Sequence, residues 1–500
     1  METELIETGI FSILPPLIAI SLALITKEVY FSLFLGLLSG VVIYGAFAGG
    51  SVLSVITNMF DMIANKISGN AYMIIFLALL WAVVVLISKS GGSEAFGRWV
   101  SKRLKTKRGA CLATSLLGCL VFIDDGFNCL TIGTIMRPVF DRHHISREKL
   151  AYIIDATAAP VCIIAPVSSW AVAIASEISS ENGFNAFLST IPYNLYAILT
   201  IFMVLFICIS GKDFGKMKKA ELKANEENPE EESGESKAVK GRVIDLVLPI
   251  IVLIICAILG MGYVGGFFSG VPFSQAIGEN PTAGLTLGAF AALITAAVLY
   301  LPRRIMKPKE FMESIVNGIG SIVPPMLILI LSWSLSGVCR EMIGTGIYIS
   351  HLVEGMSLSY RFLPFIVFVV AAAMSFSMGS SWGTFSILIP IVSMICANDS
   401  TSAFLIPALG ATLAGSVYGD HCSPISDTTI LSSIGAQCEH INHVDTQLPY
   451  ATLVAAMCAV GYLLIGFSVN NFVAIAVSLA LLAAAIFVMN KLKIKADAKS

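Results

Sequence analysis

A dense run of polar side chains at Gly419–Thr429 lies beside long apolar segments. It holds two acids, Asp420 and Asp427, together with His421 and four hydroxyl groups. Such groups are costly in hydrocarbon unless they are paired or hydrated, so a membrane segment that gathers them indicates a site for ions or protons. The candidate cation or proton ligands of this run are Asp420, His421, Ser423, Ser426 and Asp427.

His421 leaves two interpretations open. An unperturbed imidazole titrates near neutral pH, so His421 is a candidate proton carrier. The alternative is a structural histidine whose ring is satisfied by hydrogen bonds. Zinc binding by His421 and Cys422 is disfavoured, because adjacent residues rarely chelate one ion.

A second polar group contains Asp124, Asp125 and Asn128. Adjacent carboxylates repel each other in a low-dielectric site, and a bound cation or a proton relieves that repulsion. We therefore expect these residues to line a cation or proton site at the tip of a hairpin. The alternative is that the acids reach water or cap the helix that follows.

Prolines interrupt the apolar segment that follows Asp155. Pro160 and Pro166 each remove a backbone hydrogen bond and thereby free carbonyl oxygens. Freed carbonyls and hydroxyls are hard oxygen ligands suited to sodium, whereas the alternative is a kinked helix whose hydroxyls bond their own backbone. The candidate ligands here are Asp155, Thr157, Ser168 and Ser169.

The segment Ser375–Thr384 is rich in hydroxyls and small residues but carries no charge. Small residues let the backbone approach a ligand closely, and a buried hairpin tip must be lined by protein or water. Plain helix packing in the membrane is the alternative, because small residues serve that too. The candidate substrate-binding residues are Ser377, Ser380, Ser381, Trp382, Thr384 and Thr412.

Composition places these groups in a membrane protein. The chain has 500 residues, of which 56% are apolar and 13% charged, whereas a soluble protein carries about a quarter charged residues. Repeated continuous apolar runs predict an all-α polytopic membrane protein, and they disfavour a β-barrel, whose strands alternate polar and apolar residues. The chain lacks a Walker sequence, which disfavours ATP-driven transport.

The chain contains an internal repeat. Trp81 matches Trp333 at an offset of 252 residues, and Pro166–Ser169 resembles Pro424–Asp427 at an offset of 258. A charged stretch, which we interpret as a flexible linker, separates the halves. We therefore divide the chain into a first transmembrane repeat (1–210), a cytoplasmic linker (211–242), a second, inverted repeat (243–470), and an extra C-terminal helix with a basic tail (471–500).

The basic residues predict the topology. Basic clusters flank the apolar segment 110–140 on both sides, so a re-entrant hairpin keeps both clusters on one face. With 362–397 as a second hairpin, eleven crossings remain, about five per repeat, and the repeat is inverted. This arrangement predicts a multi-pass protein of the cell (inner) membrane with an extracellular N-terminus and a cytoplasmic C-terminus. The Lys and Arg residues that fall outside the predicted cytoplasmic segments are Lys66, Lys89, Arg340 and Arg361.

A last polar segment contains His440, His443 and Asp445. We expect a solvated cytoplasmic loop here, with a gate or a pH sensor as the alternative.

At these motifs the chain resembles the NhaC family of sodium/proton antiporters. The resemblance spans about residues 10–470 and is carried by Phe122–Asp125, Asp155–Thr157, Gly419–Thr429 and His443–Tyr450. It implies a fold with two re-entrant hairpins and two broken helices, often dimeric. It also implies sodium sites where the hairpin tips meet the broken helices.

We therefore expect a secondary active transporter, with sodium/proton antiport by alternating access as the main hypothesis. The alternative is sodium- or proton-coupled transport or exchange of a small organic acid or amino acid. A channel would need an open aqueous path. An enzyme would need a nucleophile, base and orienting group in line, which the neighbours Asp420, His421 and Ser423 do not provide. We expect no cofactor besides sodium as the coupling ion. The expected partners are sodium, protons, the lipid bilayer and a second copy in a homodimer, but no nucleic acid.

Overall fold

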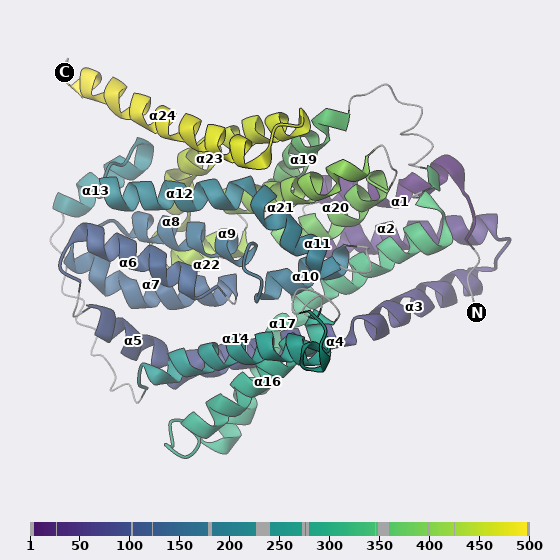
Figure 1. The fold of residues 1–500 in the computed structure, drawn as a ribbon, viewed down its shortest axis with the longest axis horizontal. Helices are drawn as coiled ribbons and strands as arrows, with labels where there is room; N and C mark the ends of the chain where they lie inside the picture. Colours follow the sequence, from purple (N-terminus) through teal and green to yellow (C-terminus); the bar gives the residue numbers. More distant parts are fainter. Residues whose placement is uncertain are drawn as a thin grey trace.

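The computed structural model describes residues 5–26, 28–101, 104–122, 124–178, 183–226, 241–272, 276, 280–345, 347–348, 360–397, 401–424 and 426–497. Over these residues the secondary structure is helical (Figure 1), and ten helices are long and apolar enough to cross a membrane. The predicted all-α, polytopic class is confirmed.

The first half contains α1 (Leu14–Thr26), α2 (Val29–Phe47), α3 (Val52–Gly69), α4 (Ala71–Ser90), α5 (Gly92–Ser101), α6 (Lys107–Leu120), α7 (Asp125–Arg142), α8 (Arg147–Thr157), α9 (Ala159–Cys162), α10 (Ser169–Glu177), α11 (Gly183–Thr190) and α12 (Leu195–Ser210). After α13 (Gly215–Glu226), the second half contains α14 (Ile244–Val264), α16 (Pro281–Tyr300), α17 (Pro308–Gly337), α19 (Leu363–Met378), α20 (Ser381–Ile395), α21 (Leu405–Cys422), α22 (Asp427–Ala436), α23 (His440–Gly466) and α24 (Asn471–Asp497).

Each half contains a helical hairpin. In the first half, α6 and α7 pack side by side, and Asp124 caps the start of α7. In the second half, α19 turns into α20 at Gly379, whose φ of 65° lies in the left-handed region that favours glycine. Figure 1 shows α6 and α7 towards the end of the molecule that carries α5 and α13, and α20 towards the end that carries α1, as an inverted repeat requires.

A broken helix follows each hairpin. In the first half, α8 ends at Thr157, and α10 starts at Ser169 with Ser168 as its N-cap. In the second half, α21 ends at Cys422, and α22 starts at Asp427 with Ser426 as its N-cap. The two second segments thus start at positions that correspond in the repeat, because each uses a serine cap shortly after a proline that cannot continue a helix.

Each broken helix packs against the hairpin of the other half. Helix α22 packs on α7 and α8, and a Cβ atom added at Gly133 would lie 2.5 Å from the Gly435 carbonyl carbon. Helix α10 packs on α20, where Trp170 lies 6.0 Å from Trp382 between ring centroids. This exchange brings the polar segments of both halves into one interior.

Part of the expected flexible linker is ordered. Residues 215–226 form α13, whereas residues 227–240 lie outside the described residues. Lys149 at the start of α8 is buried and lies 2.7 Å from Asp213 and 3.6 Å from Glu221, measured from its ammonium nitrogen to the carboxylate oxygens. A buried ammonium group needs such acidic partners. The contact between Lys149 and Glu221 therefore holds α13 against α8.

The expectation of a solvated loop around His443 is wrong. Helix α23 starts at His440, and the His443 side chain is completely buried. His440 also contacts the preceding segment, since its Nε2 lies 2.6 Å from the Pro424 carbonyl oxygen and its Nδ1 lies 3.1 Å from Ser433 Oγ. These contacts hold the start of the helix against α22 and the break before it, and burial begins at His443. Asp445 alone of the three residues fits the expectation, because its side chain is exposed and pairs with Lys216.

Candidate functional site

The first junction joins the tip of the α6–α7 hairpin to the break between α8 and α10. Asp124 is 1% exposed and accepts a hydrogen bond of 2.9 Å from the Phe127 amide. Ser169 on the broken helix is buried, and its hydroxyl lies near the Asp124 carboxylate. Asp125 starts α7 beside Asp124 and is only partly buried. The junction therefore combines a buried acid with a neighbouring hydroxyl group.

The Asn128 side chain links the hairpin tip of this junction to the end of α8. Its side-chain nitrogen lies 2.7 Å from the Gly118 carbonyl oxygen, 3.0 Å from that of Val121 and 3.4 Å from that of Thr157. The side-chain oxygen of Asn128 is buried without a partner among the described residues. The Thr157 hydroxyl donates to Ile153 in its own helix, and the Ser168 hydroxyl accepts from Ala171 as an N-cap. Those two hydroxyls thus have the local roles that were the alternative interpretation.

The second junction joins the tip of the α19–α20 hairpin to the break between α21 and α22. Ser381 donates to Asp420 over 2.7 Å, and Asp420 is 5% exposed with its other oxygen unpartnered among the described residues. The Ser381 hydroxyl also lies 3.1 Å from the Ser416 carbonyl oxygen. Ser380 caps α20 by accepting from Gly383. An acid and a serine again meet where a hairpin tip faces a broken helix.

The other candidate residues of the second half differ in what their side chains contact. The hydroxyls of Thr384 and Thr412 donate to backbone carbonyls four residues earlier, and Trp382 packs against Trp170. Ser377 is half-buried near the end of α19. In the break, Ser423 is buried and the Ser426 hydroxyl lies 3.1 Å from that of Thr428. The Asp427 side chain lies outside the described residues.

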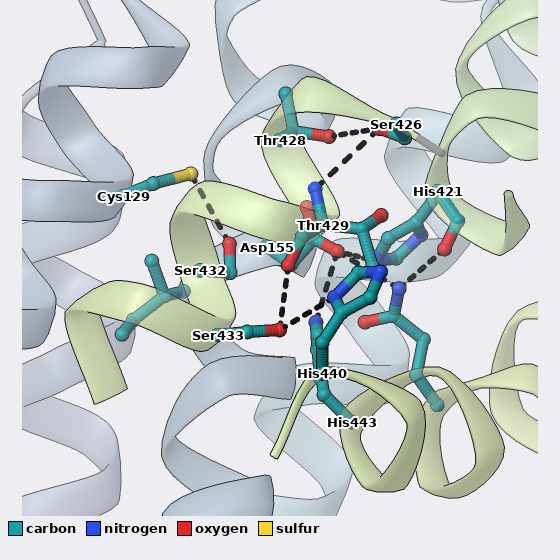
Figure 2. Close-up of polar contacts among 12 residues, drawn as sticks. Cys129, Asp155, His421, Ser426, Thr428, Thr429, Ser432, Ser433, His440 and His443 are labelled. Carbon is teal, nitrogen blue, oxygen red and sulfur yellow. Dashed lines mark hydrogen bonds and ion pairs between the residues drawn. The ribbon is translucent and has the colours of Figure 1, made fainter. Parts of the chain in front are cut away.

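A third polar cluster lies between the junctions and centres on Asp155. Figure 2 shows Asp155, His421 and His443 gathered where α22 meets the neighbouring helices. One Asp155 carboxylate oxygen accepts from Gln447 Nε2 over 2.8 Å and lies 3.3 Å from His443 Nε2. Asp155 is completely buried, and its second oxygen has no partner among the described residues.

His421 completes this cluster. Its Nδ1 lies 2.7 Å from the Tyr196 hydroxyl, and its Nε2 lies 3.8 Å from the Asp155 oxygen that His443 also faces. Gln447 also donates to the His421 backbone carbonyl oxygen, and Tyr152 stacks on the imidazole at 6.4 Å between centroids. The cluster thus joins α8, α12, α21 and α23. The His421 ring is hydrogen-bonded at Nδ1, whereas its buried Nε2 has no hydrogen-bond partner among the described residues and faces Asp155, which is the position expected of a proton carrier.

The electrostatics of the three sites are unusual for buried acids. Within the described part of the chain, no Lys or Arg pairs with Asp124, Asp155 or Asp420, and the groups able to become cationic that face Asp155 are His421 and His443. The same residues contain no group of His, Cys, Asp and Glu arranged to hold a metal ion through three such ligands. Single carboxylates with hydroxyl and carbonyl oxygens instead fit a hard monovalent cation or a proton.

Sequence analysis did not include His443, Gln447 or Tyr196 among its site residues. His443 and Gln447 are four residues apart, so a helical reading of this segment would have put both on one face. This spacing could have indicated that both side chains lie on one helix face, but the segment was interpreted as a loop. Tyr196 gave no signal, because it lies alone in an apolar segment.

Two helical hairpins facing two broken helices, with buried acids where they meet, are a construction typical of secondary transporters. The model of the Na⁺/H⁺ antiporter family matches residues 170–467 of this chain, so the chain belongs to that family. It is accordingly a multi-pass membrane transporter rather than an enzyme.

Individual relatives differ in coverage. An uncharacterized protein of Haemophilus influenzae is 40% identical over 98% of this chain and 97% of its own length. The malate-2H⁺/Na⁺-lactate antiporter of Bacillus subtilis is 26% identical over 32% of this chain and 33% of its own length. The structure of the YdaH transporter of Alcanivorax borkumensis superposes with a TM-score of 0.54 at 12% identity, covering 84% of this chain and 91% of that one. This structural likeness supports the fold alone.

Proposed function

We propose that this transporter exchanges sodium for protons by alternating access, and that the two compete at Asp155. The observation that carries the proposal is the Asp155 carboxylate, which is completely buried, with one oxygen held by Gln447 and His443 and the other unpartnered among the described residues. A buried carboxylate with a spare oxygen attracts a cation, because leaving its charge uncompensated costs several kcal/mol.

Competition follows from the position of the histidines. A sodium ion at the free Asp155 oxygen and a proton on His443 or His421 would place two positive charges close together. At a separation of about 4 Å and an effective dielectric constant of about 20, their repulsion is about 4 kcal/mol. Each tenfold change in affinity corresponds to about 1.4 kcal/mol, so this repulsion suffices to make binding of the two ions mutually exclusive.

Sodium is the proposed coupling ion at both junctions, and we propose no other cofactor. Asp124 with Ser169, and Asp420 with Ser381, each offer a carboxylate and a hydroxyl oxygen within the protein interior. In this proposal, sodium ties a hairpin tip to a broken helix, and release of sodium lets the two separate.

The proposed orientation places the basic segments in the cytoplasm. Figure 1 shows α5, α13 and the end of α24 at one end of the molecule, and α1 and α3 at the other. This arrangement supports an extracellular N-terminus and a cytoplasmic C-terminus. A cysteine introduced at Ser233 in a cysteine-less background should resist labelling from outside intact cells, and efficient labelling would reverse the orientation.

An organic cargo is the second candidate. It is favoured by the name of the Bacillus subtilis relative and by the uncharged second tip, where the start of α20 presents backbone N–H groups that suit a carboxylate. In this version, the first junction and Asp155 retain the ions, and Ser380 and Ser381 face the organic acid.

Purified protein in proteoliposomes separates the candidates. With a pH-sensitive dye inside, a sodium gradient alone should drive proton movement, and Asp155→Asn should abolish it while Asp445→Asn, at an exposed ion pair, should not. Proton movement that requires added malate, lactate or an amino acid would favour the organic cargo. Absence of proton movement under every condition, together with no sodium-driven uptake of these organic compounds, would contradict both.

A further inference from the structure

A buried acid outside the three sites lies at the end of α10. Glu177 is 1% exposed, and its Oε2 lies 3.0 Å from the Ser332 hydroxyl of α17. Its other oxygen has no hydrogen-bond partner among the described residues, although the Ser386 hydroxyl lies near the carboxyl group. The neighbouring Trp333 donates to Ser176, so α10 and α17 are joined at two successive positions. The second hairpin takes part as well, because Ser332 also contacts Ser386 of α20.

The number of hydrogens available at Ser332 indicates whether Glu177 is protonated. The Ser332 hydroxyl lies 2.6 Å from the Ser386 carbonyl oxygen and 3.0 Å from Glu177 Oε2. A hydroxyl has one hydrogen, and a backbone carbonyl can only accept. The Ser332 hydrogen therefore goes to Ser386, and the contact with Glu177 needs a hydrogen that the acid itself supplies.

The surroundings agree with a neutral acid. The titratable groups on the elements packed against α10 or directly after them are Tyr72, Lys89, Cys162, Tyr193, Lys309, Glu310, Glu313, Cys339, Arg340, Glu341 and Cys396. Among the described residues none of these forms a hydrogen bond or ion pair with Glu177, although Cys339 borders the same small cavity of about 10 Å³ as Ser332 and Ser386. An ionised Glu177 would thus be a buried charge without a counter-charge.

We propose that Glu177 is a second proton-binding site, which takes up a proton when the second hairpin is docked and releases it when the hairpin moves. The site combines one residue from the first half (Glu177), one from the scaffold of the second half (Ser332) and one from the hairpin (Ser386). When α20 withdraws, the Ser386 carbonyl leaves Ser332, and the Ser332 hydrogen becomes available to an ionised Glu177. The hydroxyl thus accepts from the neutral acid in one arrangement and donates to the carboxylate in the other. This inference rests on the proposed proton coupling for its role in transport, but not for the protonation itself.

The first test is spectroscopic and independent of transport. Infrared spectra of the purified full-length protein should contain a neutral-carboxyl stretch that shifts in D₂O and is lost in Glu177→Gln. Ser332→Ala should shift the same band, because it removes the hydrogen-bond partner, and this variant decides the matter if Glu177→Gln does not fold. The matched control is Glu313→Gln, since Glu313 is exposed and pairs only with Lys309 among the described residues. A spectrum unchanged by both Glu177→Gln and Ser332→Ala would overturn the proposal.

The second test concerns coupling. In proteoliposomes, Glu177→Gln should move one proton fewer per turnover and lose one ionisation from the pH profile. Its apparent sodium affinity should stay within about twofold of wild type, because distant sites act nearly independently. An unchanged proton-to-sodium ratio and pH profile would reject the role in coupling. If the wild type moves no protons while the carboxyl band is present and lost in Glu177→Gln, the proposed antiport fails and the protonated site stands.

Discussion

The two hairpin junctions differ in which element carries the acidic residue, the hairpin tip or the broken helix. In the first junction the acid, Asp124, belongs to the hairpin tip, and the serine, Ser169, belongs to the broken helix. In the second junction the acid, Asp420, belongs to the broken helix, and the serine, Ser381, belongs to the hairpin tip. The repeat therefore preserves the meeting of a tip with a break, whereas the charge has changed sides. What the scaffold specifies is the meeting of a hairpin tip with a broken helix, and local substitutions decide which element carries the acid.

The largest effect is expected at Asp155, which belongs to neither junction. Asp155→Asn removes the spare charge and disturbs the contacts with Gln447 and His443, so sodium-driven proton movement should fall by about a hundredfold or more, equivalent to about 2.7 kcal/mol. The measurement is dye-detected flux in proteoliposomes at equal protein content. Asp445→Asn is the control, because its exposed ion pair contributes little. If Asp155→Asn moves protons at the wild-type rate, Asp155 is not the coupling residue, and coupling must take place at the two junctions.

The next effect tests whether the junctions are equivalent. Asp124→Asn and Asp420→Asn should each weaken the sodium dependence of transport by about tenfold, or about 1.4 kcal/mol, through loss of one carboxylate charge. Asparagine caps a helix as well as aspartate does, so the cap that Asp124 provides for α7 is retained. Sodium titrations of flux give the two values. A change at only one junction would mean that the second carries something other than sodium.

A smaller effect is expected when the charge is moved within one junction. The double variant Asp124→Asn/Ser169→Asp gives the first junction the arrangement of the second, with the acid on the broken helix. It should recover part of the affinity lost in Asp124→Asn alone, because the carboxylate remains at the same meeting point. The comparison is the ratio of sodium affinities of the double and single variants. No recovery at normal expression would show that the side of the charge matters.

The elements of the site were predictable from the sequence because their signals are local. Prolines and serine caps mark both breaks, and the offset between Pro166 and Pro424 relates them. The central cluster was not predictable, because the partners of Asp155 come from a helix almost 300 residues away, at His443 and Gln447. Their polarity indicated a loop, whereas in the structure this segment is a helix packed against α8, α21 and α22. Glu177 was equally hidden, because a single acid in an apolar segment does not reveal which hydroxyls it meets.

The smallest effect concerns two corresponding hydroxyls, Thr157 and Thr412. They lie at equivalent positions of the repeat and were candidates for ion and substrate binding, yet each donates to a backbone carbonyl four residues earlier, at Ile153 and Ala408. A hydroxyl that donates to its own helix contributes about 1 kcal/mol to stability, and the Thr157 oxygen is packed against Gly118 of α6. Thr157→Val and Thr412→Val should therefore leave the sodium affinity within about twofold of wild type, at most with a slightly lower thermal stability. Parallel sodium titrations and melting curves measure both quantities. A tenfold loss of affinity in Thr157→Val alone would contradict the local role, because the hydroxyl oxygen would then be a ligand in the first junction and the repeat would differ there too.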